Sequence, residues 1–167
     1  MGYGRIILFT PQGQSNIIAF IGLILKTTIM KKLYTAVVTA SGGRDGHIKS
    51  DDGVIDLDMK KPKAMGGTED GYANPELLFA GAWGSCYLGA LGSVGKRDNV
   101  DVSEATVDVH ISFNQEGETS YALSAELHVY VPDVDKAVAQ KLADAAHKGC
   151  PYSKATRGNI DVKVIAV

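Results

Sequence analysis

Residues 74–94, NPELLFAGAWGSCYLGALGSV, carry the strongest structural signal in the chain. Asn74 is a favoured N-terminal cap, Pro75 suits the first helical position and Glu76 places an acid in the first turn, so a helix begins here. The residues that follow are apolar on nearly every side, which predicts a helix that is buried on all faces. Glycines at four positions let another backbone approach this helix closely: 81, 84, 89 and 92. We therefore expect this segment to be the central helix of the fold.

The segments on both sides of this helix have the patterns of strands. Before it, short β-branched and aromatic runs are separated by Asp-Gly turns. After it, two long segments alternate apolar and polar residues, which predicts an antiparallel hairpin with one buried face. A second, amphipathic helix follows, with Gly149 as its expected C-terminal cap. The expected strands are 33–39, 47–50, 54–57, 105–113, 121–131 and 160–167, and the second helix is 134–147. This order predicts an α+β fold, with antiparallel sheets packed around a central buried helix.

The composition is that of one compact globular domain, since 45% of the 167 residues are hydrophobic and 22% are charged. The net charge of −2 gives no reason to expect nucleic acid or an anionic membrane as a partner. We expect residues 30–167 to form the domain and residues 1–29 to be a non-core extension. The apolar run at 17–25 is shorter than the roughly 20 residues that span a bilayer, so we favour a start codon assigned upstream of Met30 over a membrane-associated leader. We expect a cytoplasmic protein without stable membrane insertion.

Cys86 and Cys150 are the only cysteines, too few for the disulfide framework of a secreted protein. Cys86 follows a run of small residues inside the central helix, and Cys150 precedes Pro151 where the second helix should end. A cysteine in an apolar helix is most often a small core hydrophobe. A thiol in mid-helix and a thiol at a helix exit can also meet across a packed interface, where they would form a thiol–disulfide redox pair. The residues alone leave both interpretations open.

Arg44 and Glu76 are the candidates for charged groups beside such a pair. A reacting thiol must be ionised, and burial opposes ionisation, so a nearby cation is needed. Arg44 lies in the turn GGRDG at 42–46, whose glycines allow the backbone to fold tightly near another element. Glu76 could hold this arginine through a bidentate carboxylate–guanidinium pair. The ordinary interpretations are a solvated turn arginine and a first-turn acid that interacts with the helix dipole.

Several motifs, taken in order, resemble the organic hydroperoxide resistance proteins of the OsmC-like group. The matching stretches are YTA at 34–36, GGRDG at 42–46, MGG at 65–67, NPELLFA at 74–80, Cys86, and CPYSKATRGN at 150–159. Residues 82–85, AWGS, are a local variant of the small-residue run that precedes the thiol. The resemblance covers roughly residues 31–167 and does not extend to residues 1–29.

The resemblance implies a thiol-dependent peroxidase that reduces organic hydroperoxides, including those of fatty acids, to alcohols and so protects against oxidative stress. Cys86 matches the peroxidatic cysteine, Cys150 the resolving cysteine, and Arg44 and Glu76 the charged pair that activates the first thiol. The family also implies an intertwined homodimer with sites at the subunit interface, no bound metal or flavin, and recycling by an external dithiol such as a protein-bound lipoyl group or dihydrolipoamide. Two alternatives stay open: an OsmC-like peroxidase of broader or inorganic peroxide preference, and a redox sensor or hydrophobic-ligand-binding module without turnover.

The spacing of Glu76 and Cys86 sets a condition on such a site. The two are ten residues apart, which is about 15 Å along an unbroken helix, so one straight helix cannot bring both into one site. We expect either a helix break near residues 81–84 or a Glu76 that reaches the site of the other subunit. Leu77, Phe79 and Tyr152 are the expected apolar walls for an alkyl chain.

Overall fold

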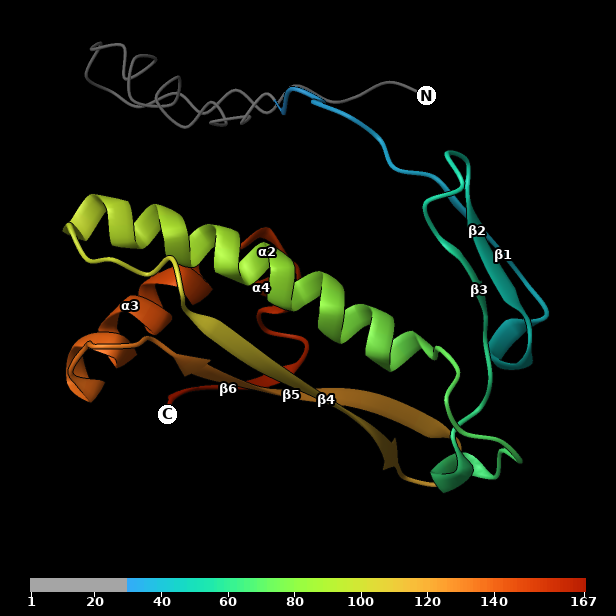
Figure 1. The fold of residues 1–167 in the computed structure, drawn as a ribbon. Coiled ribbons are helices and arrows are strands. Elements are labelled where there is room, and N and C mark those ends of the chain that lie inside the picture. The colour runs from blue at the N-terminus through green and yellow to red at the C-terminus, as the bar shows by residue number, and fades with distance from the viewer. Residues whose placement is uncertain (1–29) are drawn as a thin grey trace, which may run out of the picture. The chain divides into compact units, whose positions relative to one another are not determined.

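The structure is a computed structural model that describes residues 30–167. The expected extension, residues 1–29, lies outside the described residues. Residues 37–167 form one compact unit, which contains every helix and strand labelled in Figure 1. In chain order the elements are β1 (Val38–Ser41), a 3-10 turn (Gly43–Asp45), β2 (His47–Ser50), β3 (Asp56–Asp58), a second 3-10 turn (Lys63–Met65), α2 (Pro75–Asp98), β4 (Thr106–Glu116), β5 (Ser120–Tyr130), α3 (Lys136–Gly149), α4 (Pro151–Thr156) and β6 (Asp161–Ala166).

The long helix α2 confirms the central helix that the sequence predicts. Its N-terminal cap is Asn74, whose side-chain oxygen accepts a hydrogen bond of 2.9 Å from the Leu77 N–H. The helix continues without interruption to Asp98 and ends at Asn99, which has a left-handed backbone with φ of 55°. By length and composition α2 is apolar enough to cross a membrane, but here it packs against α3 and β4.

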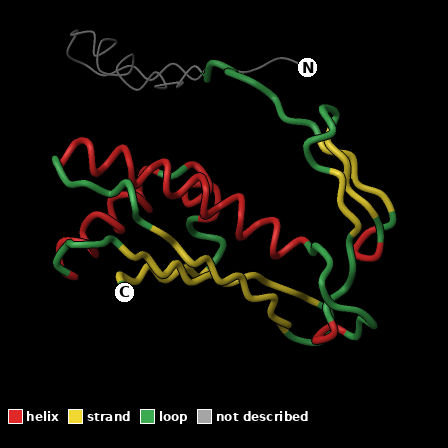
Figure 2. The backbone as a smooth tube through the Cα atoms, in the orientation of Figure 1, coloured by secondary structure: helices red, strands yellow, loops and turns green. Residues whose placement is uncertain are grey.

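A three-stranded sheet in the order β4-β5-β6 supports this helix. β4 and β5 form the expected antiparallel hairpin, with Thr106 opposite Tyr130 and Glu116 opposite Ser120. Buried and less buried residues alternate along β5, and Ala125, Leu127 and Val129 belong to the core. The helices α2 and α3 lie over one face of the β4-β5-β6 sheet (Figure 2). The fully buried core residues include Trp83, Tyr87, Leu91, Leu127, Val129 and Ala143.

The last strand, β6, runs parallel to β5, so the expectation of wholly antiparallel sheets is wrong for this pair. A parallel neighbour requires a long crossover connection, and α3 and α4 together supply it. The short helix α4 was not expected either. Gly149 is the last residue of α3 and not its cap, because Cys150 takes the capping position with an extended backbone and also precedes α4.

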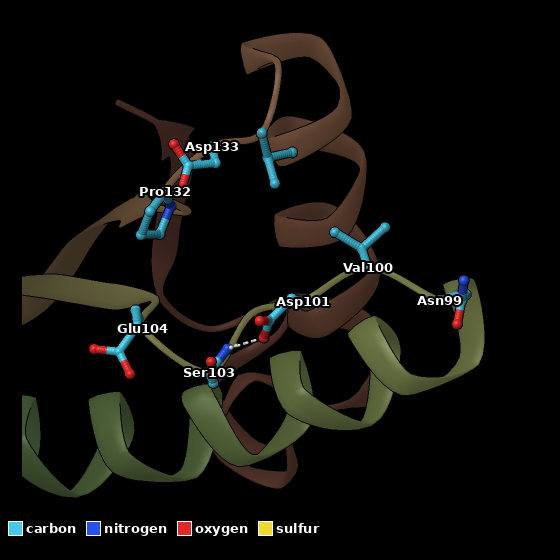
Figure 3. Close-up of a pocket in the computed structure, with 8 residues that line it drawn as sticks. Asn99, Val100, Asp101, Ser103, Glu104, Pro132 and Asp133 are labelled. Atoms are coloured by element: carbon cyan, nitrogen blue, oxygen red, sulfur yellow. Dashed lines mark hydrogen bonds between the residues drawn. The ribbon is translucent and has the colours of Figure 1, made fainter.

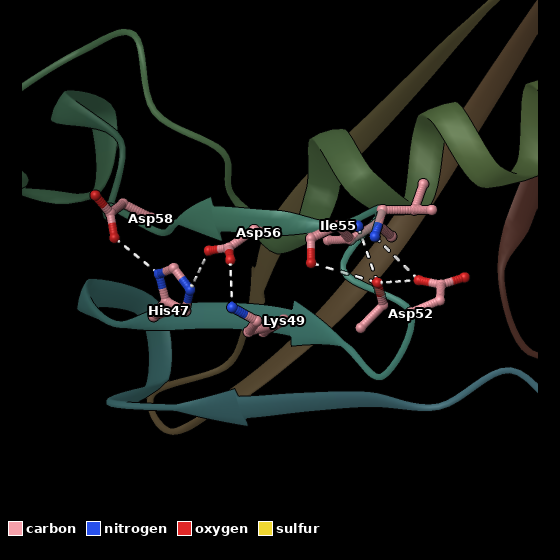
Figure 4. Close-up of polar contacts among 8 residues, drawn as sticks. His47, Lys49, Asp52, Ile55, Asp56 and Asp58 are labelled. Atoms are coloured by element: carbon pink, nitrogen blue, oxygen red, sulfur yellow. Dashed lines mark hydrogen bonds and ion pairs between the residues drawn. The ribbon is translucent and has the colours of Figure 1, made fainter.

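The other sheet, β1-β2-β3, is antiparallel throughout. Its side chains are mostly exposed, and polar contacts join its strands (Figure 4). His47 lies between two carboxylates, with Nε2 at 2.8 Å from Asp56 and Nδ1 at 2.9 Å from Asp58. β1 begins at Val38 and not at residue 33, because its pairing with β2 starts at Val38 opposite Ser50.

One face of α2 is buried, and residues 30–167 leave the opposite face uncovered. The buried side consists of Trp83, Gly84, Tyr87, Leu91, Val94 and Gly95. On the other side Leu77 is 60% exposed, and Gly81, Ser85, Gly89 and Gly92 are exposed as well. The prediction of a helix buried on every face is therefore wrong within residues 30–167 of one chain. The apolar character of the second face needs another explanation, since α3 and the β4-β5-β6 sheet cover only the first.

Candidate active site

The two cysteines, 64 positions apart in the chain, lie side by side in the folded structure. Their sulfur atoms are 3.6 Å apart and both thiols are free. A disulfide bond is about 2.05 Å long, so a shift of roughly 1.5 Å would join them. The pair therefore has the geometry of a thiol–disulfide couple in its reduced form.

Different elements deliver the two sulfurs. Cys86 projects from the middle of α2, one turn after the buried Trp83. Cys150 stands at the junction of α3 and α4, where its N–H donates to the Ala146 carbonyl and its own carbonyl accepts from the Lys154 N–H. Cys150 is fully buried, whereas Cys86 is partly accessible. Cys86 is thus the sulfur that an external molecule can reach first.

The surroundings of Cys86 oppose ionisation of its thiol. Burial raises the pKa of Cys86, the backbone N–H of Tyr152 lowers it, and the neighbouring Cys150 raises it again. Because only the thiolate is a strong nucleophile, a further positive group must approach Cys86 if this sulfur is to react readily.

Arg44 and Glu76 form the bidentate pair that the motif argument anticipates. Nη2 of Arg44 donates to Oε1 of Glu76 at 2.7 Å, and Nη1 donates to Oε2 at 2.8 Å. The guanidinium hydrogen bonds lower the pKa of Glu76, and the same bonds raise that of Arg44. With side chains 29% and 15% exposed, the two groups are ionised and partly shielded from water.

Two further residues hold the guanidinium, and the sequence did not single them out for this role. The Arg44 guanidinium lies over the Phe113 ring at 4.8 Å from its centre, within the range of a cation–π contact. The Met65 sulfur is 4.0 Å from Nη1. Met65 belongs to the MGG motif, so the family resemblance pointed to it. Phe113 showed only the pattern of an inward-facing residue in an alternating strand.

The glycines of the GGRDG turn are needed for the position of Arg44. Gly42 adopts a left-handed backbone with φ of 69°. A Cβ on Gly46 would collide with the Ser41 carbonyl oxygen, so only glycine fits at this place. The Asp45 carboxylate accepts a hydrogen bond from the Lys61 N–H at 3.1 Å, which ties the turn to the loop that follows β3.

The charged pair and the sulfur pair are two separate groups within one chain. Glu76 is in the first turn of α2 and Cys86 is ten residues later in the same unbroken helix, which corresponds to about 15 Å. The alternative of a helix break near residues 81–84 is therefore wrong. The other alternative, a Glu76 that serves the site of a second subunit, stays a prediction.

An open, largely apolar cavity of about 410 Å³ adjoins the charged pair. Glu76 and Leu77 line it from α2, and the remaining walls are Pro62, Ala64, Met65, Asn74, Ala80, Val109, Ile111 and Phe113. Of the expected apolar walls, only Leu77 contributes here. Phe79 and Tyr152 instead contact each other near the sulfurs, with ring centres 6.3 Å apart.

Another cavity of about 410 Å³ lies at the far end of α2 (Figure 3). Its walls include Asp101, Glu104 and Asp133, and the Ser103 N–H donates to the Asp101 carboxylate at 2.9 Å. None of the candidate residues lines it. Among residues 30–167, no group of three or more His, Cys, Asp or Glu side chains is arranged to hold a metal ion.

The fold and the paired thiols define the class of this protein. A family model described as OsmC-like protein matches residues 67–165, and the α+β fold with two sheets and a long central helix is shared by the solved structures of this class.

Comparison with individual proteins places the chain in one family of this class. The organic hydroperoxide resistance protein OhrB of Bacillus subtilis (strain 168) is 45% identical over 133 residues, 79% of this chain and 96% of that protein. The organic hydroperoxide resistance protein of Xanthomonas axonopodis pv. citri (strain 306) is 41% identical over 133 residues, 79% of this chain and 93% of that protein. A crystal structure of an organic hydroperoxide resistance protein from Elizabethkingia anophelis has a TM-score of 0.76 at 45% identity, covering 82% of this chain and 98% of that one. The chain belongs to the organic hydroperoxide resistance family within the OsmC-like group.

Proposed function

We propose that this protein is a cysteine-based peroxidase that reduces organic hydroperoxides, including those of fatty acids, to alcohols. The observation that carries the proposal is the 3.6 Å separation of the Cys86 and Cys150 sulfurs, with Cys86 the more accessible of the two. Membership of the organic hydroperoxide resistance family supports the choice of substrate class.

The first step oxidises Cys86. Its thiolate attacks the terminal oxygen of the hydroperoxide, an S–O bond forms as the O–O bond breaks, and the alkoxide leaves with a proton as the alcohol. Cys86 is then a sulfenic acid. The Cys150 sulfur attacks it, water leaves, and a Cys86–Cys150 disulfide remains. An external dithiol reduces this disulfide by exchange and is itself oxidised to a disulfide.

The site is completed, we infer, by a second copy of the chain in an intertwined homodimer. Within one chain Glu76, which binds Arg44, lies about 15 Å along α2 from Cys86. The pKa of the Cys86 thiol is raised, whereas a nucleophile needs it lowered. The guanidinium of the partner, brought beside Cys86, would supply the missing positive charge.

The uncovered surfaces support the same assembly. The exposed face of α2 is a row of small and apolar residues at helical spacing, and a groove of about 600 Å³ runs between this face and β4. In the other sheet, Val38 and Leu57 expose 46% and 40% of their surface. Exposed apolar residues that gather on one surface are typical of an interface between subunits.

The reductant in this proposal is a dithiol, either a protein-bound lipoyl group or a small dihydrolipoamide-type compound. A dithiol suits the task because it can displace both sulfurs in succession and leave as a cyclic disulfide. A cytoplasmic setting would provide such a reductant and would keep the resting thiols reduced. Residues 30–167 then need no bound cofactor of their own for this cycle.

Steady-state turnover tests the proposal. Purified protein with dihydrolipoamide should consume tert-butyl or lipid hydroperoxide over many cycles, faster than hydrogen peroxide, and Cys86→Ser should abolish this. Equal rates with hydrogen peroxide would favour an OsmC-like peroxidase of broader preference. Consumption of one equivalent per site, with no further turnover when dithiol is present, would favour a redox sensor. Full turnover by Cys86→Ser would refute the assignment of the nucleophile.

A further inference from the structure

The short helix α4 sets the position of Cys150. It has only six residues, Pro151–Thr156, and a helix of this length is not stable by itself in water. Cys150 immediately precedes it and provides the carbonyl that accepts from the Lys154 N–H. The Tyr152 N–H, in the first turn, lowers the pKa of Cys86. Cys150 is held on one side by α3, through its N–H bond to the Ala146 carbonyl, and on the other by α4, so the anchoring of α4 helps to determine where Cys150 lies relative to Cys86.

One buried hydrogen bond ties α4 directly to α2. The indole N–H of Trp83 donates to the Ser153 hydroxyl oxygen at 3.0 Å, across 70 positions of sequence, and both side chains are fully buried. Trp83 lies one turn before Cys86 on α2, and Ser153 lies one turn after Cys150 on the α4 side. The Trp83–Ser153 bond thus links α2 to the segment that begins at Cys150, as the sulfur–sulfur contact does.

The neighbouring contacts strengthen this link. Thr156 donates its hydroxyl to the Ser153 carbonyl at 3.2 Å. Phe79 stands between the two aromatic side chains, with its ring centre 5.4 Å from that of Trp83 and 6.3 Å from that of Tyr152. The polar bond is the directional part of the contact, since an aromatic cluster alone tolerates small shifts of a helix.

We propose that Trp83 and Ser153 are positioning residues for the disulfide-forming step: their hydrogen bond holds α4 on α2 and so keeps Cys150 within reach of an oxidised Cys86. The inference rests on the proposed peroxidase cycle. In the step concerned, the Cys150 sulfur forms a bond to the Cys86 sulfur, the S–O bond of the Cys86 sulfenic acid breaks, and the oxygen leaves as water with the Cys150 proton. Neither positioning residue touches the peroxide, so the first oxidation of Cys86 does not depend on them.

The rate of disulfide formation can be measured through a competing reaction. While the sulfenic acid waits, a second hydroperoxide can oxidise it irreversibly to a sulfinic acid. If α4 frays, Cys150 spends less time near Cys86, and a larger share of the Cys86 sulfenic acid is oxidised to sulfinic acid. Loss of the Trp83–Ser153 bond should therefore slow disulfide formation and increase sulfinic acid, while the rate of first oxidation stays unchanged.

The experiment compares Trp83→Phe, Ser153→Ala and the double variant with Tyr87→Phe as a matched control. Tyr87 is also a buried aromatic residue of α2, and its hydroxyl donates to the Ala143 carbonyl on α3 at 2.7 Å, so its loss removes a comparable bond without cutting the link to α4. Each protein receives one equivalent of tert-butyl hydroperoxide, and in a second series an excess, without reductant. Quenched samples are analysed by mass spectrometry for dione-trapped sulfenic acid, disulfide and sulfinic acid.

We expect disulfide formation to be slower by about tenfold in Trp83→Phe and Ser153→Ala, which corresponds to about 1.4 kcal/mol, the scale of a buried polar group left without its partner. The double variant should be no slower than the worse single variant, because each removes the same bond. Wild type and Tyr87→Phe should form disulfide at similar rates. Equal rates in all five proteins would overturn the inference, as would slowing in Tyr87→Phe by the same factor. If even the wild type accumulates sulfenic acid without forming disulfide, the proposed peroxidase cycle itself fails.

Discussion

Two inactive variants should restore activity to each other if the site is shared between subunits. One subunit carries Cys86→Ser and keeps Arg44, and the other carries Arg44→Ala and keeps Cys86. Each homodimer lacks one required group at both of its sites, so each should be inactive. In a mixed dimer, the intact Cys86 of one subunit meets the intact Arg44 of the other, and one site is complete.

The expected magnitude follows from the geometry of α2. Within one chain, Glu76 and its partner Arg44 are about 15 Å along the helix from Cys86, well beyond the range of a hydrogen bond to its sulfur. A shared site therefore gives the mixed dimer one working site of two, and about half of the wild-type rate per dimer. A site built within each chain gives the mixed dimer none.

The assay uses co-expression of the two variants with different affinity tags and purification on both tags in succession, so that only mixed dimers remain. Turnover of tert-butyl hydroperoxide is then measured with dihydrolipoamide. A mixed dimer of Cys86→Ser with the wild-type chain serves as the control for one working site. A variant pair as inactive as its parents, beside an active control, would refute the assembly of the site across subunits.

The remaining predictions concern the stability of the site and the fate of Cys86. Glu76→Gln should lower the free energy of unfolding by about 2 kcal/mol at pH 7, because Arg44 loses a charged acceptor. Since the pKa of Glu76 is lowered from its usual 4.5, this stabilisation is present above pH 4.5 and is lost as the pH falls below it. Denaturant titrations at pH 7 and pH 3 should therefore show a smaller difference at pH 3, and an unchanged difference would contradict the role of the ion pair. Gly46→Ala should cost about 1–3 kcal/mol in the same titration because its methyl group meets the Ser41 carbonyl, whereas Gly149→Ala, which has open space, should change stability by less than about 1 kcal/mol. Cys150→Ser should trap Cys86 as sulfenic acid after one equivalent of hydroperoxide and as sulfinic acid with excess, and intact-mass measurements that find no added oxygen would speak against Cys86 as the oxidised residue.

Much of the fold could be predicted because its signals are local. The cap and first turn of α2 depend on three consecutive residues, Asn74 to Glu76, and the structure shows that start. The β4-β5 hairpin depends on strict alternation over two adjacent segments, and its register follows from the short turn between them. The bounds of β1 were less predictable, because a short strand extends only as far as its partner allows.

The candidate residues were identified through motifs, and their grouping into a thiol pair and a charged pair was anticipated, but the residues that surround the two pairs were not. Arg44 and Glu76 were expected to pair, and they do, but the additional contacts to Phe113 and Met65 depend on how β4 and the loop after β3 fold around the guanidinium. Ser153 lies in the CPYSKATRGN motif and Trp83 in the AWGS variant, but nothing in the sequence indicated that the two side chains would bond to each other. A tryptophan in an apolar helix and a serine in a short polar segment look ordinary until the two elements are packed together.

The amino-acid sequence by itself determined where α2 begins, which segments form the β4-β5 hairpin, which residue types carry the chemistry, and to which family the motifs point, because each of these depends on neighbouring residues. Only the tertiary structure decided that α4 exists, that β6 runs parallel to β5, that the described part of the chain leaves one face of α2 uncovered, and that the Cys86 and Cys150 sulfurs lie 3.6 Å apart. These features depend on contacts between residues that are distant in the chain. Packing of the whole core supplies the free energy that stabilises these features, so they cannot be predicted from local patterns of residues.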